Sequence, residues 1–319
     1  MDLLSLYYFS ETVKDMHITK AANRLYVSQQ TLSNHIIRLE EYYGTKLFNR
    51  KPTLSLTYAG EIVLRFAEMV YREDKNILDR LADIKNQKQG LILFGASTLR
   101  MSSCLPNILP KFSKQFPDIE IRITDANSKI LEEKILRGDL DLAIAISADT
   151  PDIAKIHLMY DQIYLCVTNH LLQKYYDNEA ETLKEKSYLG ADVKDFSKLP
   201  FCMLDNQLGQ NIQKCFVEAD FSPKVFTTSS YIQISTSIGL QGLAACFATR
   251  TSLLNLEGKI PKDICIFPLL YKGKPLTQDI FLIHHKKRYL TSYINYFIDL
   301  TKNYFYEVEK LSIKDSIEN

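Results

Sequence analysis

The chain has 319 residues, of which 46% are hydrophobic and 24% are charged, and its formal net charge is +1. This length suits two or three domains better than one, and the apolar content excludes a disordered chain. The near-neutral charge excludes a protein coated with nucleic acid, but it permits a local basic module. Residues 1–60 carry seven Lys or Arg and five Asp or Glu, a local net charge of +2.

Six cysteines are scattered through apolar stretches, at positions 104, 166, 202, 215, 246 and 265. No pair has CxxC spacing and no histidine completes a zinc set, so we expect buried thiols of a reducing compartment, no metal and no cofactor. The N-terminus lacks the pattern of a signal peptide, and no apolar run reaches the roughly 20 residues of a membrane helix. These features predict a cytoplasmic protein without a membrane partner.

The first three elements have helical periodicity. An amphipathic helix is predicted by apolar residues that step by three and four, namely Leu3, Leu6, Phe9 and Val13. Two shorter helices are expected within residues 18–40. Their apolar stripes are Ala21, Ala22 and Leu25 in the first, and Leu32, Ile36 and Leu39 in the second. Ser28 can cap the later helix by accepting a backbone N–H, and the small Ala pair allows the close crossing of a helix-turn-helix.

The face opposite the second stripe carries amides, hydroxyls and a cation: Gln29, Gln30, Thr31, Ser33, Asn34 and Arg38. No acidic residue occurs from position 16 to position 39. Such a helix can read base edges in the major groove of double-stranded DNA, since amides pair with adenine and Arg pairs with guanine. The alternative is a solvated polar helix face.

A short hairpin follows this helix. Gly44 tolerates the positive φ that ends a helix, Leu47 and Phe48 serve as core anchors, and residues 54–57 alternate like a strand after a turn at 50–52. A helix-turn-helix followed by a small hairpin is a winged helix. The cations Lys20, Arg24, Arg50 and Lys51 are then candidate phosphate contacts, which position a module without reading sequence; solvent exposure without a partner is the alternative for each.

At this point the chain resembles a known family. The pattern AA..L..SQ..LS..I..LE...G..LF.R.....LT.AG resembles the N-terminal domain of LysR-type transcriptional regulators. It is carried here by Ala21, Ala22, Leu25, Ser28, Gln29, Leu32, Ser33, Ile36, Leu39, Glu40, Gly44, Leu47, Phe48, Arg50, Leu56, Thr57, Ala59 and Gly60. Three features depart from the family pattern: His17 replaces a usual Ser, Gln30 replaces a usual Pro, and the wing is about one residue short and lacks a second Arg.

A long helix is predicted over residues 58–89. Val63, Phe66, Val70, Ile77 and Ile84 fall on a heptad seam, and Leu81 lies beside it. Such a seam predicts a coiled coil, and the resemblance implies a linker helix that dimerises the DNA-binding domains. The alternative is that this helix packs only on its own domain. The expected division is a winged helix at 1–58 and a linker at 59–89.

From residue 90 the chain alternates strands and helices, which predicts a parallel sheet with covering helices. Strands are expected near 91–97, 119–124, 139–147, 161–168, 201–204, 224–230, 243–249, 265–270 and 279–285; helices are expected at 101–116, 130–137, 211–219, 232–240 and 289–311. The resemblance implies a periplasmic-binding-protein-like effector domain over 90–311. Its first lobe would be 90–160 with 266–311, its second 161–265, and 312–319 a frayed polar tail.

Polar side chains cluster where several of these strands end: Ser97, Thr98, Ser102, Ser103, Asn127, Ser128, Asn206, Ser229 and Ser230. In open α/β folds such positions border a ligand cleft, so they are the candidate effector-binding residues. Ordinary helix capping is the alternative for any one of them. Arg100 could bind a carboxylate or face solvent.

Two further clusters have competing interpretations. Cys202 and Cys215 lie where peroxide-sensing members of the family place a reactive pair, although their spacing differs and Cys202 lies inside an apolar strand. A cysteine-based redox sensor is therefore an alternative function. Adjacent His284 and His285 precede residues 286–288, all cationic, but neighbouring strand residues point to opposite faces and cannot chelate together. We expect a solvated basic strand end there.

The sequence as a whole therefore predicts an α/β protein with three parts: a winged helix-turn-helix, a linker helix and a two-lobe effector domain. The resemblance implies a sequence-specific DNA-binding regulator, a homo-oligomer (dimer or tetramer) controlled by an unidentified small-molecule effector, with RNA polymerase as a candidate partner. A ligand sensor whose N-terminal module docks protein is the other alternative. An enzyme is not expected, because no phosphate-binding loop, nucleophile elbow or metal set is present.

Overall fold

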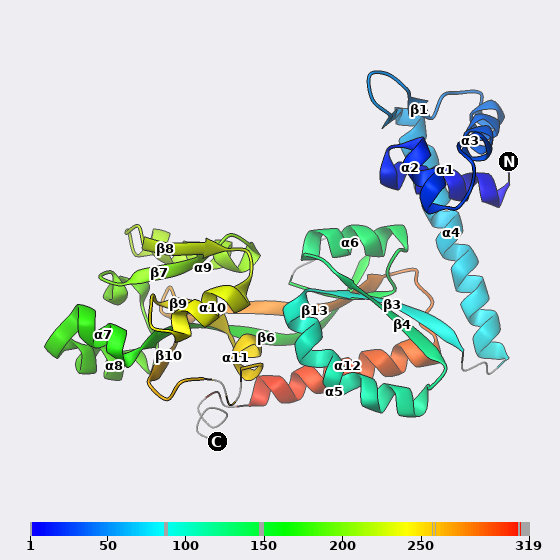
Figure 1. Ribbon diagram of the computed structural model, residues 1–319. Helices are drawn as coiled ribbons and strands as arrows, with labels where there is room; N and C mark the ends of the chain where they lie inside the picture. Colours follow the sequence, from blue (N-terminus) through cyan, green and yellow to red (C-terminus); the bar gives the residue numbers. More distant parts are fainter. Residues whose placement is uncertain are drawn as a thin grey trace.

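A computed structural model describes residues 2–85, 89–146, 150–256, 258, 260–311 and 313. The N-terminal domain lies at one end of a long helix, and the two-lobed remainder of the chain packs against the other end (Figure 1). Of the predicted linker, residues 86–88 lie outside the described residues, and so does the predicted tail apart from Ile313.

The N-terminal domain is a winged helix-turn-helix, as predicted. It consists of α1 (Leu3–Asp15), α2 (Ile18–Arg24), α3 (Gln29–Tyr43) and the antiparallel strands β1 (Phe48–Asn49) and β2 (Ser55–Leu56). Its buried core includes Leu6, Phe9, Ala21, Ala22, Leu32, Ile36, Leu39, Leu47 and Phe48. Ser28 caps α3, His17 caps α2 through its ring nitrogen, and Gly44 ends α3 with a φ of 66°.

Helix α4 (Tyr58–Ile84) is the predicted linker, and its N-terminus is capped by Thr57. The predicted seam divides into two parts. Val63, 6% exposed, lies in the core of the winged domain, and Phe66 and Val70 pack against that core. Including Val63 in a dimer seam was therefore wrong, because this turn of the helix already covers its own domain. Ile77, Leu81 and Ile84 extend beyond that domain and are exposed.

The largest sheet is mixed, whereas a parallel sheet was predicted. Its path runs β10 (Ile264–Pro268), β6 (Ile153–Thr168), β13 (Thr277–His285), β5 (Leu142–Ala145), β3 (Gly90–Ala96) and β4 (Ile119–Asp125), with β9 (Cys246–Thr249) also paired to β6. Only β3, β4 and β5 are parallel to one another; β6, β13, β10 and β9 pair antiparallel. The sheet is mixed because β6 and β13 run between the two lobes in opposite directions and pair with each other.

Three helices cover the sheet of the first lobe: α5 (Thr98–Gln115), α6 (Ser128–Arg137) and α12 (Ser292–Lys310). Helices α5 and α12 pack together on one face, and α6 lies on the other (Figure 1). Pro106 and Pro110 lie in the interior of α5, which begins three residues earlier than predicted.

The second lobe has its own core of 24 buried residues. Its remaining strands are β7 (Pro200–Leu204) and β8 (Lys224–Ser229), a parallel pair, with the short hairpin β11 (Leu270–Tyr271) and β12 (Lys274–Pro275). Its helices are α7 (Asn169–Tyr176), α8 (Ala180–Ser187), α9 (Gln207–Glu218), α10 (Ile232–Leu240) and α11 (Arg250–Leu254), with 3-10 turns at Asp177–Glu179 and Val193–Phe196. No elements were predicted for α7 and α8.

Strand β6 passes through both lobes without a break. Its residues 153–162 pair with β13, and residues 164–168 pair with β10. The predicted lobe limit at 160/161 falls inside this strand. The second predicted boundary, where the chain would re-enter the first lobe at 265/266, falls inside β10. Cys265 and Phe267 of β10 are buried in the second lobe, so the chain re-enters the first lobe only at β13. The predicted frayed tail was wrong at Ile313, which is buried beside β6 and β9 residues.

Candidate nucleic-acid interface and effector cavity

Helix α3 presents the predicted polar face to solvent. Gln29, Gln30, Thr31, Asn34 and Arg38 are exposed, and Ser33 is half-buried. The opposite stripe is fully buried, because it closes the core of the winged domain. Gln29 accepts the Thr19 hydroxyl at 3.2 Å, and the Arg38 guanidinium contacts the His35 ring. A helix that is anchored on one side and exposes amides, hydroxyls and a guanidinium on the other can be inserted into the major groove.

The cations around α3 differ in their partners. Arg24 pairs with Glu11 and, at 2.7 Å, with Asp15, and it also donates to the Glu11 carbonyl. These bonds tie α2 to α1, so Arg24 has a structural role that the phosphate prediction did not include. Lys20 lies 3.3 Å from Asp15, and Arg50 lies 3.8 Å from Glu40. For Lys51, on the exposed wing, no ion pair is found within the described part of the chain.

A cavity of about 840 Å³ lies between the two lobes. Six of the nine predicted effector residues line it: Ser97, Thr98, Asn127, Ser128, Asn206 and Ser230. The capping alternative also holds for two of them, since Asn127 accepts the N–H of Ile130 and Asn206 accepts that of Gly209.

The other three predicted residues point elsewhere. Ser102 donates to the Leu99 carbonyl within α5, Ser103 bonds the Tyr304 hydroxyl at 2.6 Å on the α12 side, and Ser229 accepts the N–H of Tyr231. Ser102 and Ser103 are four and five residues beyond Thr98. One turn of helix carries them away from the edge where the strand ends, so including them was wrong.

The inner wall of the cavity contains polar residues that the sequence analysis did not identify. Gln278 is paired in register with Asp161 where β13 and β6 run between the lobes. Both are buried, and Gln278 lines the cavity together with Arg100 and Thr249. The signal that could have found them is a polar residue at the start of an otherwise apolar strand pattern. Arg100, left undecided, is buried and does not face solvent.

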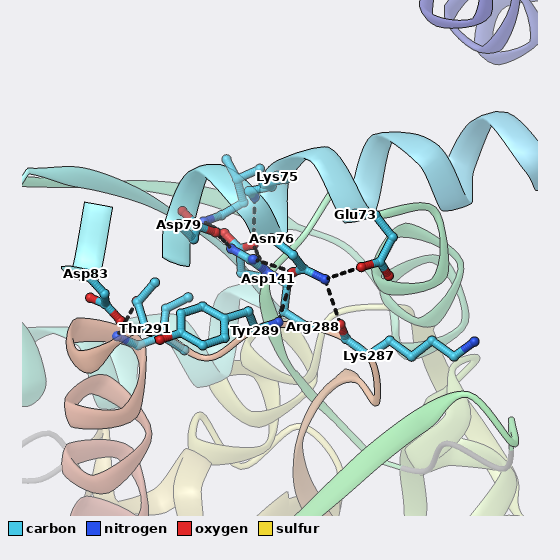
Figure 2. A network of polar contacts seen from close by, with 12 residues as sticks. Glu73, Lys75, Asn76, Asp79, Asp83, Asp141, Lys287, Arg288, Tyr289 and Thr291 are labelled. Carbon is cyan, nitrogen blue, oxygen red and sulfur yellow. Dashed lines mark hydrogen bonds and ion pairs between the residues drawn. The ribbon is translucent and has the colours of Figure 1, made fainter. Parts of the chain in front are cut away.

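A buried polar network joins α4 to the first lobe (Figure 2). Arg288, in the turn after β13, donates Nε to Asp141 at 2.8 Å and Nη1 to the Asn76 side-chain oxygen at 3.0 Å. Its Nη2 forms an ion pair of 2.5 Å with Asp79 that lacks hydrogen-bond alignment. Lys75 lies 2.7 Å from Asp141. The network therefore connects two consecutive turns of α4 to the core of the effector domain.

The expectation of a solvated basic strand end holds only for Lys286 and Lys287, which are exposed. His284, His285 and Arg288 are all buried. The imidazole of His284 contacts the His285 carbonyl at 3.0 Å, and His285 Nδ1 accepts the N–H of Lys287. Arg288 is buried because Asn76 and Asp79 of α4 bind it, and no local pattern in residues 284–288 indicates that a distant helix does so.

Comparison with known proteins decides the family. A model described as "Bacterial regulatory helix-turn-helix protein, lysR family" matches residues 3–61, and one described as "LysR substrate binding domain" matches residues 85–305. This chain belongs to the LysR family of bacterial transcriptional regulators. It is a DNA-binding regulator with an effector-binding domain, from a family whose members bind DNA and form oligomers.

Individual relatives agree with this membership. The HTH-type transcriptional regulator YkuM of Bacillus subtilis is 23% identical over 306 residues, which cover 95% of this chain and 97% of that protein. A full-length OxyR variant from Pseudomonas aeruginosa has the same fold, with a TM-score of 0.68 and 19% identity over 98% of this chain and 99% of that one. Full-length CbnR in complex with its target DNA gives a TM-score of 0.57 at 18% identity, covering 95% and 100% of the two chains.

The cysteines of this regulator are buried, as predicted. Burial raises the pKa of Cys202 and of Cys215 to about 12, so both are protonated and poorly nucleophilic at neutral pH. This opposes the redox alternative. Among the described residues, no helix is long and apolar enough to cross a membrane.

Proposed function

We propose that α3 reads base edges, with Gln29, Gln30, Ser33, Asn34 and Arg38 as the reading residues and with Lys20, Arg50 and Lys51 on the phosphates. The single observation that carries this assignment is the exposed polar face of α3, anchored from behind by Leu32, Ile36 and Leu39. Gln30, which replaces the proline usual in the family, adds an amide at the first turn. Ser28 and Thr31 hold that turn through the N-cap.

We also propose a dimer through α4, with an altered seam. At 100° per residue, the exposed apolar residues of α4 that lie within about 100° of one another are Tyr58, Ile62, Met69, Ile77 and Ile84. Around the helix axis, Tyr58, Ile62 and Met69 lie about 100° or more from the buried Val63 and Ala67. Ile77 and Ile84 lie within about 60° of Val63 in angle but two or more turns further along α4, beyond the winged domain. A second copy could therefore meet α4 without displacing the winged domain. Pairing of dimers into tetramers and contact with RNA polymerase are further parts of the proposal, as is a cytoplasmic location.

The effector cavity fits a control role. A small molecule between the lobes would change their closure about β6 and β13, the strands that run between them. Strand β13 leads directly into the turn that holds Arg288 and hence α4. Differential binding of the effector to open and closed states would then alter how two α3 helices are spaced on DNA.

The experiment uses the full chain and a duplex enriched from a randomised pool. The pair Gln29→Ala and Arg38→Ala should lower affinity for that duplex at least tenfold while leaving the oligomer size unchanged. The matched control replaces exposed residues outside both sites, Gln213→Ala and Arg122→Ala. Unchanged binding by the α3 variant would refute the assignment.

The salt dependence separates this function from the alternative in which the N-terminal module docks protein. Binding to DNA should weaken steeply between 50 and 200 mM salt, because phosphate contacts release counterions. Failure to enrich any duplex, together with salt-independent capture of a protein, would favour the docking alternative.

A further inference from the structure

The cavity wall contains a buried cation that no carboxylate among the described residues contacts directly, although the charge of Asp161 acts on it from beyond 4 Å. Arg100 is 8% exposed; its Nη1 donates to the Ser97 hydroxyl at 3.1 Å and its Nη2 donates to Gln278 Oε1 at 3.3 Å. Both partners are neutral, and no carboxylate in the described part of the chain lies within 4 Å of this guanidinium. A buried charge is costly unless an opposite charge compensates it. Asp161 is nearby, but one of its oxygens already accepts the Thr251 N–H at 3.1 Å.

A second donor lies in the same wall without a partner. Gln278 is 3% exposed, and its Nε2 makes no hydrogen bond among the described residues, although its Oε1 is bound to Arg100. Buried amide N–H groups are almost always paired in folded proteins, so an unpaired one beside a cavity indicates a missing acceptor. Arg100 and Gln278 both line the cavity, and Nε2 itself has almost no exposed surface, so a ligand reaches this donor only when the Gln278 side chain turns toward it.

The local helix also favours an anion there. Arg100 lies in the first turn of α5, where the helix dipole disfavours a cation and favours an anion. Ser97, at the N-cap, makes no capping bond, because its hydroxyl is directed to Arg100. In the first turn of α5, the N–H of Thr98 donates to Asp125 at 2.8 Å. An anionic acceptor beside Arg100 would interact favourably with both the guanidinium and the positive end of the helix dipole.

The rest of the wall limits the charge of the ligand. Besides Arg100, the lining contains one further cation, Lys129, and three acidic residues, Asp125, Glu132 and Asp205, so the cavity as a whole has no positive excess. Apolar side chains line it as well, including Ile130, Ile144, Ile146, Leu208, Tyr231 and Ile232. Attraction for an anion is therefore local to Arg100, while the remainder suits an apolar body.

We propose that the effector is a small monocarboxylate with an apolar body, whose carboxylate accepts hydrogen bonds from Arg100 and from Gln278 Nε2. This rests on the proposed effector role of the cavity and specifies its ligand. A carboxylate supplies the direct anionic contact that the guanidinium lacks and satisfies the unpaired amide, and a bidentate contact to Arg is the strongest of such bonds.

The test measures thermal unfolding of the full chain with a panel of aliphatic and aromatic monocarboxylates of four to eight carbons. Each acid is compared with its primary amide and with the dicarboxylate of the same length. Binding to the folded state raises the melting temperature, so we expect a shift of several degrees for at least one monocarboxylate and none for its amide. Equal shifts with the amide, a larger shift with the dicarboxylate, or no shift across the panel would overturn the proposal.

Variants locate the contact. Arg100→Gln and Gln278→Leu should each weaken the affinity for the active acid, measured by calorimetry, at least tenfold. Lys129→Gln, which removes a cation from the same wall, and Arg122→Gln, outside the cavity, should change it less than threefold. Retained affinity in both Arg100 and Gln278 variants would refute the site. All four variants should still bind DNA in the absence of the acid, because none of them alters α3. Failure of the unaltered protein to bind DNA would refute the proposed function and not the ligand assignment.

Discussion

The guanidinium of Arg288 donates to the carboxylate of Asp141 at 2.8 Å, and both side chains are almost completely buried. Asp141 also accepts the N–H of Leu93 from β3, and it forms an ion pair with Lys75 of α4. One carboxylate therefore joins the sheet of the first lobe, the turn after β13 and the linker helix. Burial opposes the charge of Arg288, but Asp141 and Asp79 outweigh it and raise its pKa.

Removing this cation should destabilise the effector domain strongly. Arg288→Met leaves Asp141 with Lys75 as its one cation among the described residues and removes the ion pair of Asp79. Breaking buried pairs of this kind costs about 3–5 kcal/mol in unfolding free energy. The control Arg122→Met breaks the exposed Arg122–Glu120 pair, which solvent screens, so it should leave the unfolding free energy almost unchanged. Urea unfolding of the two variants measures the difference, and equal losses would contradict the role given to the network.

Acid should destabilise the protein through the two buried histidines. Burial lowers the pKa of both His284 and His285, and the charge of Arg72 lowers that of His285 further. The unfolded chain then binds protons at a higher pH than the folded one. This contribution to stability is present above the ordinary histidine pKa near 6.5 and is lost as pH falls below it. A double variant, His284→Gln and His285→Gln, should show a flatter melting temperature between pH 7.5 and 5.5; an unchanged slope would count against the histidines.

Lys51 should behave as a phosphate contact. Lys51→Ala is expected to weaken binding to all DNA sequences alike and to reduce the slope of log affinity against log salt by about 1. Measuring that slope for an enriched duplex and for an unrelated one tests it, and a loss confined to the enriched duplex would mean that Lys51 reads bases.

Arg24 should behave differently, because its guanidinium is held by Glu11 and Asp15. Arg24→Ala should lower the unfolding free energy by roughly 1 kcal/mol, a figure kept small since the side chain is 41% exposed. The salt slope of DNA binding should stay the same. A lower salt slope of DNA binding with unchanged stability would indicate that Arg24 contacts phosphate instead.

The thiols should be inert while the chain is folded. Burial raises the pKa of Cys104 to about 12, as it does for Cys202 and Cys215. A thiol reagent at neutral pH should therefore label all six cysteines only after denaturant is added, and peroxide should leave DNA binding unchanged. Rapid labelling of Cys202 or Cys215 in the folded protein would revive the redox alternative.

Much of the N-terminal domain could be predicted because its determinants are local. Ser28 caps a helix three residues on, Gly44 ends the same helix with a positive φ, and Leu32, Ile36 and Leu39 form one face by spacing alone. The effector cavity was predicted in part, since strand ends attract polar residues. The prediction did not hold for Ser102 and Ser103, because closeness to a strand end in the sequence does not specify which way a helical residue points.

The sequence by itself determined the winged helix and the long linker, because caps, periodicity and fixed motif spacing act over a few residues, and the two-lobe fold was implied by the family resemblance. The tertiary structure decided which polar side chains are buried together. Arg100 meets Gln278 across 178 positions, and Arg288 meets Asp141 across 147. Ser97, the local partner of Arg100, is a neutral hydroxyl and does not reveal that environment. The physical reason is that desolvation and charge pairing depend on which distant elements pack against one another, and only the folded chain brings those elements together.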